Sequence, residues 1–171
     1  DSCATAVGEY QLAAGERLEF VKYLVYTDSI RCHDPETAGK NLMRQTVRHG
    51  YNHYADGQVR YLDDFWKRAG ITLPGASGVE ASLRYSIYQL LASTGRDVYA
   101  NISAKGLSGE GYDWHYFWDT EIYMMPFLTL TCPEHAENLL RFRCRTLEKA
   151  KAEAKSLGHR RGAKIPWRTI S

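Results

Sequence analysis

A glycine-rich stretch that passes into aromatic residues and acids is the part of this chain whose residue types and spacing most clearly suggest chemistry. It runs from Gly106 to Glu121 and reads Gly-Leu-Ser-Gly-Glu-Gly-Tyr-Asp-Trp-His-Tyr-Phe-Trp-Asp-Thr-Glu. Aromatic rings cover the C–H faces of a pyranose, and carboxylates accept hydrogen bonds from its hydroxyls. The stretch therefore predicts a sugar-binding loop, and an apolar segment follows it over 122–130.

Four side chains are candidate substrate-binding residues. Trp118 and Asp119 stand where the loop is expected to pass into a helix, and Tyr112 lies earlier in the loop. Trp167 lies in a second motif, 162–170, which reads Gly-Ala-Lys-Ile-Pro-Trp-Arg-Thr-Ile. For three of these residues a purely structural role remains an alternative to sugar binding. Asp119 is equally suited to cap the next helix, Trp118 is a ring of the kind that is often mostly buried, and Tyr112 is as well suited to simple packing.

The two motifs resemble the signature of glycoside hydrolase family 65. Residues 106–121 resemble its G-L-S/T-G-E-G-Y…H…F-W-D-T-E run, and 162–167 resemble the G-A-x-x-P-W segment that follows in the same family. The resemblance implies an inverting disaccharide phosphorylase, with trehalase-type hydrolases as relatives. It also implies that Asp119 binds hydroxyls of the glucose at the −1 subsite, with Trp118 and Trp167 as pocket residues.

The resemblance further implies that the catalytic residues lie in sequence downstream of this chain. Inverting cleavage needs a carboxylic acid that protonates the leaving oxygen and a nucleophile on the opposite face. The resemblance places the general acid, a glutamate, downstream, so no catalytic residue is assigned within this chain. The full-length protein is expected to convert kojibiose, nigerose, maltose or trehalose plus inorganic phosphate into β-glucose 1-phosphate and an acceptor sugar. No cofactor is expected, and the chain alone is interpreted as an inactive fragment.

Two alternatives to a phosphorylase stay open. One is a trehalase-type hydrolase of the same family, in which water replaces phosphate, and the other is a non-catalytic sugar-binding fragment. Among the phosphorylases, the segment Pro166-Trp167-Arg168 favours the kojibiose-like members. The chain also departs from the family, which usually has glycine just before the signature histidine. Here Asp113-Trp114 stands in that region, and its large ring is expected to reshape acceptor binding at the +1 subsite.

The hydrophobic patterning predicts a mainly α fold, and the resemblance implies that it is part of an (α/α)6 barrel. Residues 18–26 read as a strand, which predicts the end of a larger β domain, and the resemblance implies that 1–29 end an N-terminal β-sandwich domain. Residues 30–78 are expected to form a helical linker, and 79–171 the first, incomplete part of the catalytic barrel.

Local signals place the helices of these ranges. Asp34-Pro35 is expected to start a helix that stops at Gly50, and a second helix is expected to end at Gly70. The expected helices of the barrel are an amphipathic one over 79–94 and an apolar one over 119–130 with a kink or a restart around Pro126. A long helix is expected to follow, which a capping box at Thr131–Glu134 opens and Gly158 ends.

Composition narrows the class of protein. The 171 residues are 44% hydrophobic and 25% charged, and the sequence holds no apolar run of about 18 residues, so a membrane span is not expected. The net charge is +2, with +8 over 141–171 and −6 over the first 140 residues. Lysines of the basic end alternate with alanines as on a solvated helix face, which argues against nucleic-acid binding.

Cysteine and histidine spacing bear on location and metal content. The four cysteines form no CxxC pair, which favours free thiols and a cytoplasmic protein. His49 and His53 flank Gly50 with no third ligand near, so no metal site is expected.

Homodimerisation of the full-length protein is left open. The isolated segment is expected to be unstable, because its apolar helix faces would lack the rest of the barrel.

Overall fold

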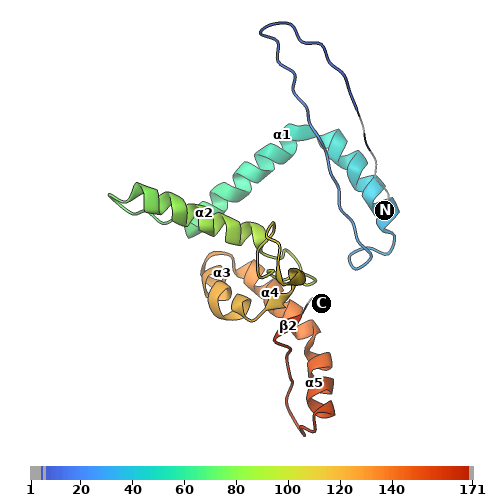
Figure 1. Ribbon diagram of the computed structural model, residues 1–171, viewed down its shortest axis with the longest axis vertical. Coiled ribbons are helices and arrows are strands. Elements are labelled where there is room, and N and C mark those ends of the chain that lie inside the picture. Colours follow the sequence, from blue (N-terminus) through green and yellow to red (C-terminus); the bar gives the residue numbers. More distant parts are fainter. Residues whose placement is uncertain (1–4, 6, 170–171) are drawn as a thin grey trace. The chain divides into compact units, whose positions relative to one another are not determined.

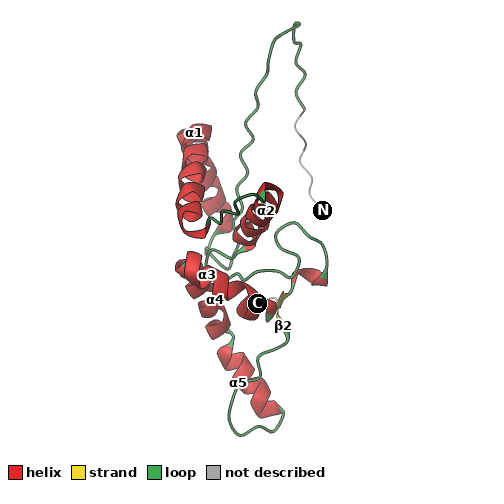
Figure 2. Ribbon diagram, turned by 90° about the vertical axis from the view of Figure 1, so that its left-hand side faces the viewer, coloured by secondary structure: helices red, strands yellow, loops and turns green. Residues whose placement is uncertain are grey.

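The computed structural model describes residue 5 and residues 7–169, and helices dominate its secondary structure (Figures 1 and 2). The helices are α1 (Pro35–Ala69), α2 (Ser77–Ser93), η1 (Tyr112–Trp114), η2 (Thr120–Met124), α3 (Met125–Thr131), α4 (Pro133–Arg145) and α5 (Leu147–Ser156). Within the described ranges the strands are β1 (Tyr116–Phe117) and β2 (Arg168–Thr169). The mainly α fold class is confirmed, and membership of an (α/α)6 barrel stays a prediction. Contacts divide the chain into two compact units, Asp1–Gly57 and Gln58–Ser171.

The segment before α1 is extended but forms no strand, so the strand predicted over 18–26 is wrong for the described residues. A turn at Ala14-Gly15 precedes this segment: Gly15 has a φ of 88°, and the Glu16 N–H donates to the Ala13 carbonyl at 3.1 Å. A strand needs a neighbour that supplies a ladder of N–H and C=O groups, and no described residue supplies one to this segment. The assignment of 1–29 to a β-sandwich therefore stays a prediction.

Helix α1 starts and breaks where the sequence signals predict. Asp34 Oδ1 accepts the Thr37 N–H at 3.1 Å, which is an N-cap, and Pro35 takes the first helical position. Gly50 has a φ of 76° and a ψ of 171°, so it interrupts the helix at the expected position. The second half ends at Ala69, and the Gly70 N–H still donates to the Trp66 carbonyl at 2.9 Å.

The second unit is built around a core that four helices share. The C-terminal part of α1 contributes Phe65, α2 contributes Leu91, α3 contributes Leu128 and α4 contributes Leu139. The apolar stripe expected on α2 is confirmed, since Ile87 and Leu91 are buried while Leu83 and Leu90 pack against the same core. Full burial of one such side chain stabilises the fold by roughly 1.5–3 kcal/mol, so this core holds the loops between the helices in place.

The apolar segment after the signature loop is helical in two steps. It begins as one π-helical stretch, η2, and continues as α3, with Pro126 in the first turn. Proline is tolerated there because the first N–H groups of a helix have no intrahelical acceptor. The expected restart at Pro126 is therefore confirmed, whereas the π-helix was not predicted.

Two predictions about the following helix are wrong. Thr131 is the last residue of α3, and its hydroxyl donates back to the Phe127 carbonyl at 2.9 Å, so it cannot form a capping box. The N-cap of α4 is Cys132, which makes no side-chain capping bond. The single long helix is two helices, α4 and α5, which meet at Thr146 with a ψ of −3°. The end at Gly158 is confirmed, and the Gly158 and His159 N–H groups close a Schellman motif on the Lys155 and Ala154 carbonyls.

The structure bears on two expectations that came from the composition. No helix in the described part of the chain is long and apolar enough to cross a bilayer. Cys32, Cys132 and Cys144 are free thiols, while Cys3 lies outside the described residues.

Candidate functional site

A two-stranded sheet joins the two motifs that the sequence analysis singled out. Strand β1 pairs with β2 in antiparallel fashion, with Tyr116 opposite Thr169 and Phe117 opposite Arg168. The indole N–H of Trp118 donates to the Pro166 carbonyl at 3.0 Å, a contact between residues 48 positions apart. The signature loop and residues 166–169 of the second motif therefore lie side by side.

Aromatic rings cluster around this sheet. The centroids of Trp118 and Trp167 lie 6.1 Å apart with a 43° tilt, and Phe117 meets Trp167 edge-on at 6.3 Å. Tyr112 packs edge-on against Phe117 at 5.4 Å, which brings the third predicted aromatic residue into the same cluster. Trp118 is 39% exposed and Trp167 is 65% exposed, so neither ring belongs to the buried core. Exposed, mutually fixed rings of this kind suit the C–H face of a sugar.

Asp119 occupies the N-cap position of η2 without capping it. Its backbone is helical, with a φ of −52° and a ψ of −34°, and its side chain makes no capping hydrogen bond. The residue is exposed, and within the described part of the chain its carboxylate has no hydrogen bond or ion pair. Asp34 at the start of α1 does cap, so the structure distinguishes the two aspartates. The carboxylate of Asp119 is consequently free to accept hydrogen bonds from a ligand.

The loop ahead of β1 is held in an unusual backbone conformation. Tyr112, Asp113 and Trp114 have φ angles of 55°, 49° and 60°, a left-handed region that non-glycine residues seldom adopt, least of all three in a row. His115 closes this turn, because its N–H and its Nδ1 both reach the Tyr112 carbonyl, at 2.9 and 2.8 Å. His115 therefore helps to hold the loop in this conformation. Such backbone strain costs on the order of 1–3 kcal/mol per residue and clusters at functional sites.

An ion pair between Arg143 and Glu121 connects α4 to the residues around Trp118 and Asp119. Arg143 of α4 contacts both carboxylate oxygens of Glu121 through Nε at 2.7 Å and NH2 at 3.1 Å. The same guanidinium donates to the Phe117 carbonyl at 3.1 Å, directly before Trp118. The side chains of Arg143 and Glu121 are only 10% and 27% exposed. Sequence spacing gave no signal for Arg143, because its partners lie on other elements.

We expect Arg143→Ala to destabilise this site by about 3–5 kcal/mol, because it leaves the largely buried Glu121 carboxylate unpaired and frees the Phe117 carbonyl. Native-state hydrogen exchange of the β1 amides in the full-length protein measures the effect. Arg141→Ala is the matched control, since its pair with Glu137 is exposed and such pairs contribute at most about 1 kcal/mol. Equal protection of β1 in both variants would contradict the prediction.

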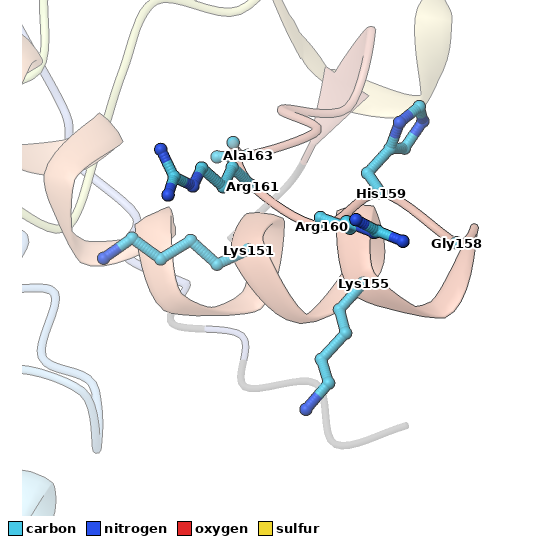
Figure 3. A pocket seen from close by; sticks show the side chains of 8 residues that line it. Lys151, Lys155, Gly158, His159, Arg160, Arg161 and Ala163 are labelled. Carbon is cyan, nitrogen blue, oxygen red and sulfur yellow. The ribbon is translucent and has the colours of Figure 1, made fainter.

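The hollows on the surface of the second unit differ in the residues that line them. One of about 620 Å3 is bounded by Trp167, Lys164 and Glu153. Another lies between α5 and the loop 158–163 and is lined by Lys151, Lys155, His159, Arg160 and Arg161. Figure 3 shows the charged end of Lys155 pointing away from the charged ends of Lys151 and Arg161, which extend to one side. Because these charges do not converge and no tryptophan, tyrosine or phenylalanine lines this hollow, it is not the candidate sugar site.

One group of residues has the side-chain types of a metal site, but these side chains contact other side chains of the protein. Ligand atoms of Cys132, Glu134 and His135 lie within 4.8 Å of one another. Arg68 contacts the Cys132 sulfur at 3.9 Å and Glu134 at 3.7 Å, so a cation already occupies one side. Burial raises the pKa of the Cys132 thiol, and nearby Glu134 adds to this, which opposes the thiolate that a metal needs. These residues do not fit a metal ion.

His135 is the pH-sensitive member of this network. It is buried, and its Nε2 contacts the Tyr61 hydroxyl at 3.1 Å and the guanidinium of Arg96. Burial first, and then the charge of Arg96, hold its pKa below the usual 6.5. The folded protein therefore keeps this imidazole neutral at pH values where the unfolded chain protonates it.

We expect the contribution of His135 to stability to be complete above pH 6.5 and to be lost as the pH falls below it. The unfolded state then binds the extra proton, so the free energy of unfolding falls by up to about 1.4 kcal/mol per pH unit. Denaturant unfolding of the full-length protein between pH 8 and pH 5.5 measures this slope. In His135→Leu the slope should be smaller by about one proton, and identical slopes in both proteins would refute the assignment.

Comparisons with known proteins show the family to which the chain belongs. Residues 84–171 match the model of the glycosyl hydrolase family 65 central catalytic domain. An α,α-trehalose phosphorylase of Geobacillus stearothermophilus is 45% identical over 91% of this chain and 20% of its own length. A kojibiose phosphorylase of Caldanaerobacter subterraneus subsp. tengcongensis is 34% identical over 93% of this chain and 21% of its own.

A solved structure agrees as well. A putative kojibiose phosphorylase from the human microbiome is 32% identical with a TM-score of 0.71, over 79% of this chain and 18% of that one. The chain belongs to glycoside hydrolase family 65, which confirms the family that the two motifs indicated. It spans about a fifth of the length of the curated relatives it matches.

Proposed function

We propose that the full-length protein containing this chain is an inverting phosphorylase of an α-linked glucose disaccharide, and that this chain supplies part of the donor-glucose subsite. The observation that carries the proposal is the exposed Asp119, which directly follows Trp118 in the chain, together with the pairing of the Trp118 and Trp167 rings. It is supported by membership of a family whose matched relatives are named as disaccharide phosphorylases. Residues 79–171 would then be the first part of an (α/α)6 catalytic barrel, preceded by the linker and the β-sandwich end.

Each proposed substrate contact has a distinct task. A carboxylate such as Asp119 accepts hydrogen bonds from two neighbouring hydroxyls and so fixes the orientation of the donor glucose. The bond from the Trp118 indole to Pro166 holds that ring in one orientation, so its face is presented without loss of side-chain entropy on binding. Trp167 supplies a second face, and the Tyr112 hydroxyl supplies a further donor or acceptor at the loop.

The chemistry would proceed by a single displacement. A glutamate outside this chain protonates the leaving glycosidic oxygen while inorganic phosphate attacks C1 from the opposite face, which gives β-glucose 1-phosphate. Phosphate is already anionic and needs no general base, so the reaction requires no cofactor beyond this co-substrate. Free thiols at Cys32, Cys132 and Cys144 are in keeping with a cytoplasmic enzyme, where phosphate is plentiful.

Among the disaccharides we favour α,α-trehalose. The trehalose phosphorylase relative shares 45% identity with this chain, whereas the kojibiose phosphorylase shares 34%. This preference replaces the inclination toward kojibiose that the Pro166-Trp167-Arg168 segment suggested.

Incubation of the purified full-length protein with trehalose, kojibiose, nigerose or maltose tests the proposal. Each sugar is supplied with phosphate or with sulfate at the same ionic strength, and NMR identifies the anomer of the product. We expect β-glucose 1-phosphate only when phosphate is present. Glucose release at the same rate in sulfate would identify a trehalase-type hydrolase, and sugar binding without turnover would identify a non-catalytic protein; either result would refute a phosphorylase.

A further inference from the structure

One side chain, Arg143 of α4, contacts the chain on both sides of the Trp118–Asp119 pair. Its NH2 donates to the carbonyl of Phe117, which directly precedes Trp118, at 3.1 Å. Its Nε and NH2 donate to the two carboxylate oxygens of Glu121, the second residue after Asp119, at 2.7 and 3.1 Å. A guanidinium is planar and its donors have a fixed geometry, so it sets the direction as well as the length of these contacts. Both ends of the segment 117–121 are therefore fixed to α4.

The first turn of η2 lies between these two contacts and has an unusual hydrogen-bond pattern. The Trp118 carbonyl accepts the N–H groups of both Glu121 and Ile122, at 3.0 and 3.2 Å. At the other end of η2 the Met125 N–H donates to the Thr120 carbonyl, five residues earlier, which is the π-helical pattern. Turns of this kind are rare and occur frequently at functional sites. The pattern places the Trp118 carbonyl over the first N–H groups of the helix.

This placement explains why Asp119 does not cap the helix. An aspartate at an N-cap position normally accepts the N–H of the second or third helical residue. In η2 those residues are Glu121 and Ile122, whose N–H groups already donate to the Trp118 carbonyl. Asp119 is exposed and its side chain makes no capping hydrogen bond, whereas the next residue, Thr120, is buried. The carboxylate thus stays available only while the Trp118 carbonyl keeps its place.

We propose that Arg143 is a positioning residue for the proposed phosphorolysis, an inference that rests on the proposed function. By holding Phe117 and Glu121, it keeps the Trp118 carbonyl on the first N–H groups of η2. The Asp119 carboxylate is then left to the donor sugar. When the guanidinium is lost, the carbonyl can move away, and the carboxylate can turn back to cap the helix. Arg143 itself does not touch the substrate.

The environment of the ion pair favours this role over a purely stabilising one. The side chains of Arg143 and Glu121 are 10% and 27% exposed, so both charges are largely removed from water. Desolvation of two charges offsets most of their attraction, and apolar residues of similar size often stabilise a fold as well or better. The guanidinium instead supplies directed hydrogen bonds, which an apolar side chain cannot. Orientation of the segment 117–121 is therefore what this pair contributes.

A double-mutant cycle in the full-length enzyme tests this role, with all rates measured well below the melting temperature of each variant. Arg143→Lys keeps the positive charge but loses the fork. We expect it to lower kcat/KM for phosphorolysis by about 30-fold, mostly in kcat, as displacement of a substrate contact does. In the Asp119→Asn background the same change should cost less than about threefold, because the contact it positions is already lost. If the two residues acted independently, the double variant would show the full product of both losses.

Two further variants complete the test. Glu121→Gln keeps the size of the side chain but removes the charge that orients Arg143. It should lower kcat by about tenfold, and this loss should also disappear in the Asp119→Asn background. Arg141→Lys is the control, because Arg141 lies on the same helix and its pair with Glu137 is exposed; it should keep kcat/KM within about twofold of the wild type.

The outcomes separate the inference from the proposed function. Losses that multiply in the double variants overturn the inference and leave the proposed function standing, and so does wild-type kcat in Arg143→Lys. Should Arg143→Lys fail to fold, the cycle of Glu121→Gln with Asp119→Asn decides alone. A wild-type enzyme without phosphorolysis refutes the proposed function itself, and the inference with it.

Discussion

Asp119→Asn is expected to lower kcat/KM for phosphorolysis by roughly 10³-fold in the full-length enzyme. The amide keeps the shape of the side chain but accepts hydrogen bonds with one oxygen only and places an N–H where a sugar hydroxyl donates. The loss is large because the interaction is charge-assisted and the neighbouring rings exclude water from it. Because a −1 contact strengthens as positive charge develops on the sugar ring, most of the loss should fall on kcat.

Steady-state kinetics with disaccharide at saturating phosphate measure this effect. Asp63→Asn is the matched control, since Asp63 is an exposed aspartate on α1 away from both motifs, and it should retain full activity. Trp167→Ala should instead raise KM for the disaccharide, because it removes a stacking face. Wild-type kcat/KM in Asp119→Asn would mean that this carboxylate does not touch the donor sugar, and the proposed subsite would have to be abandoned.

A polypeptide of these 171 residues, produced by itself, is not expected to unfold cooperatively. The second unit, Gln58–Ser171, leaves large apolar side chains uncovered. Along η2 and α3, Ile122, Tyr123 and Leu130 are 57%, 76% and 84% exposed, a patch of the kind that soluble monomers rarely leave uncovered.

Calorimetry and dye binding test this expectation. The isolated polypeptide should show a broad, weak heat-capacity change, bind a hydrophobic dye and self-associate, while the full-length protein melts sharply. Leu130→Lys should reduce dye binding and association of the isolated polypeptide without producing a sharp melt, because it removes apolar surface but adds no core. A monomeric polypeptide with one sharp transition would contradict the expectation and would favour a self-standing sugar-binding unit.

The sequence by itself determined the local features of this protein. The cap at Asp34, the break at Gly50, the buried stripe of α2 and the stop at Gly158 each depend on residues within about one helical turn, so short-range signals suffice. The family was likewise readable, because its two motifs are contiguous runs of specific side chains. The candidate residues Trp118, Asp119 and Trp167 came from those runs.

Only the tertiary structure decided how these pieces meet. The pairing of β1 with β2, the bond from Trp118 to Pro166 and the ion pair between Arg143 and Glu121 join residues on separate elements, and no local pattern encodes them. The failed predictions have the same origin: the hydroxyl of Thr131 is taken by the preceding helix, and residues 18–26 have no partner strand among the described residues. A hydrogen-bonding group takes its locally preferred partner unless tertiary packing supplies a different partner or leaves it without one.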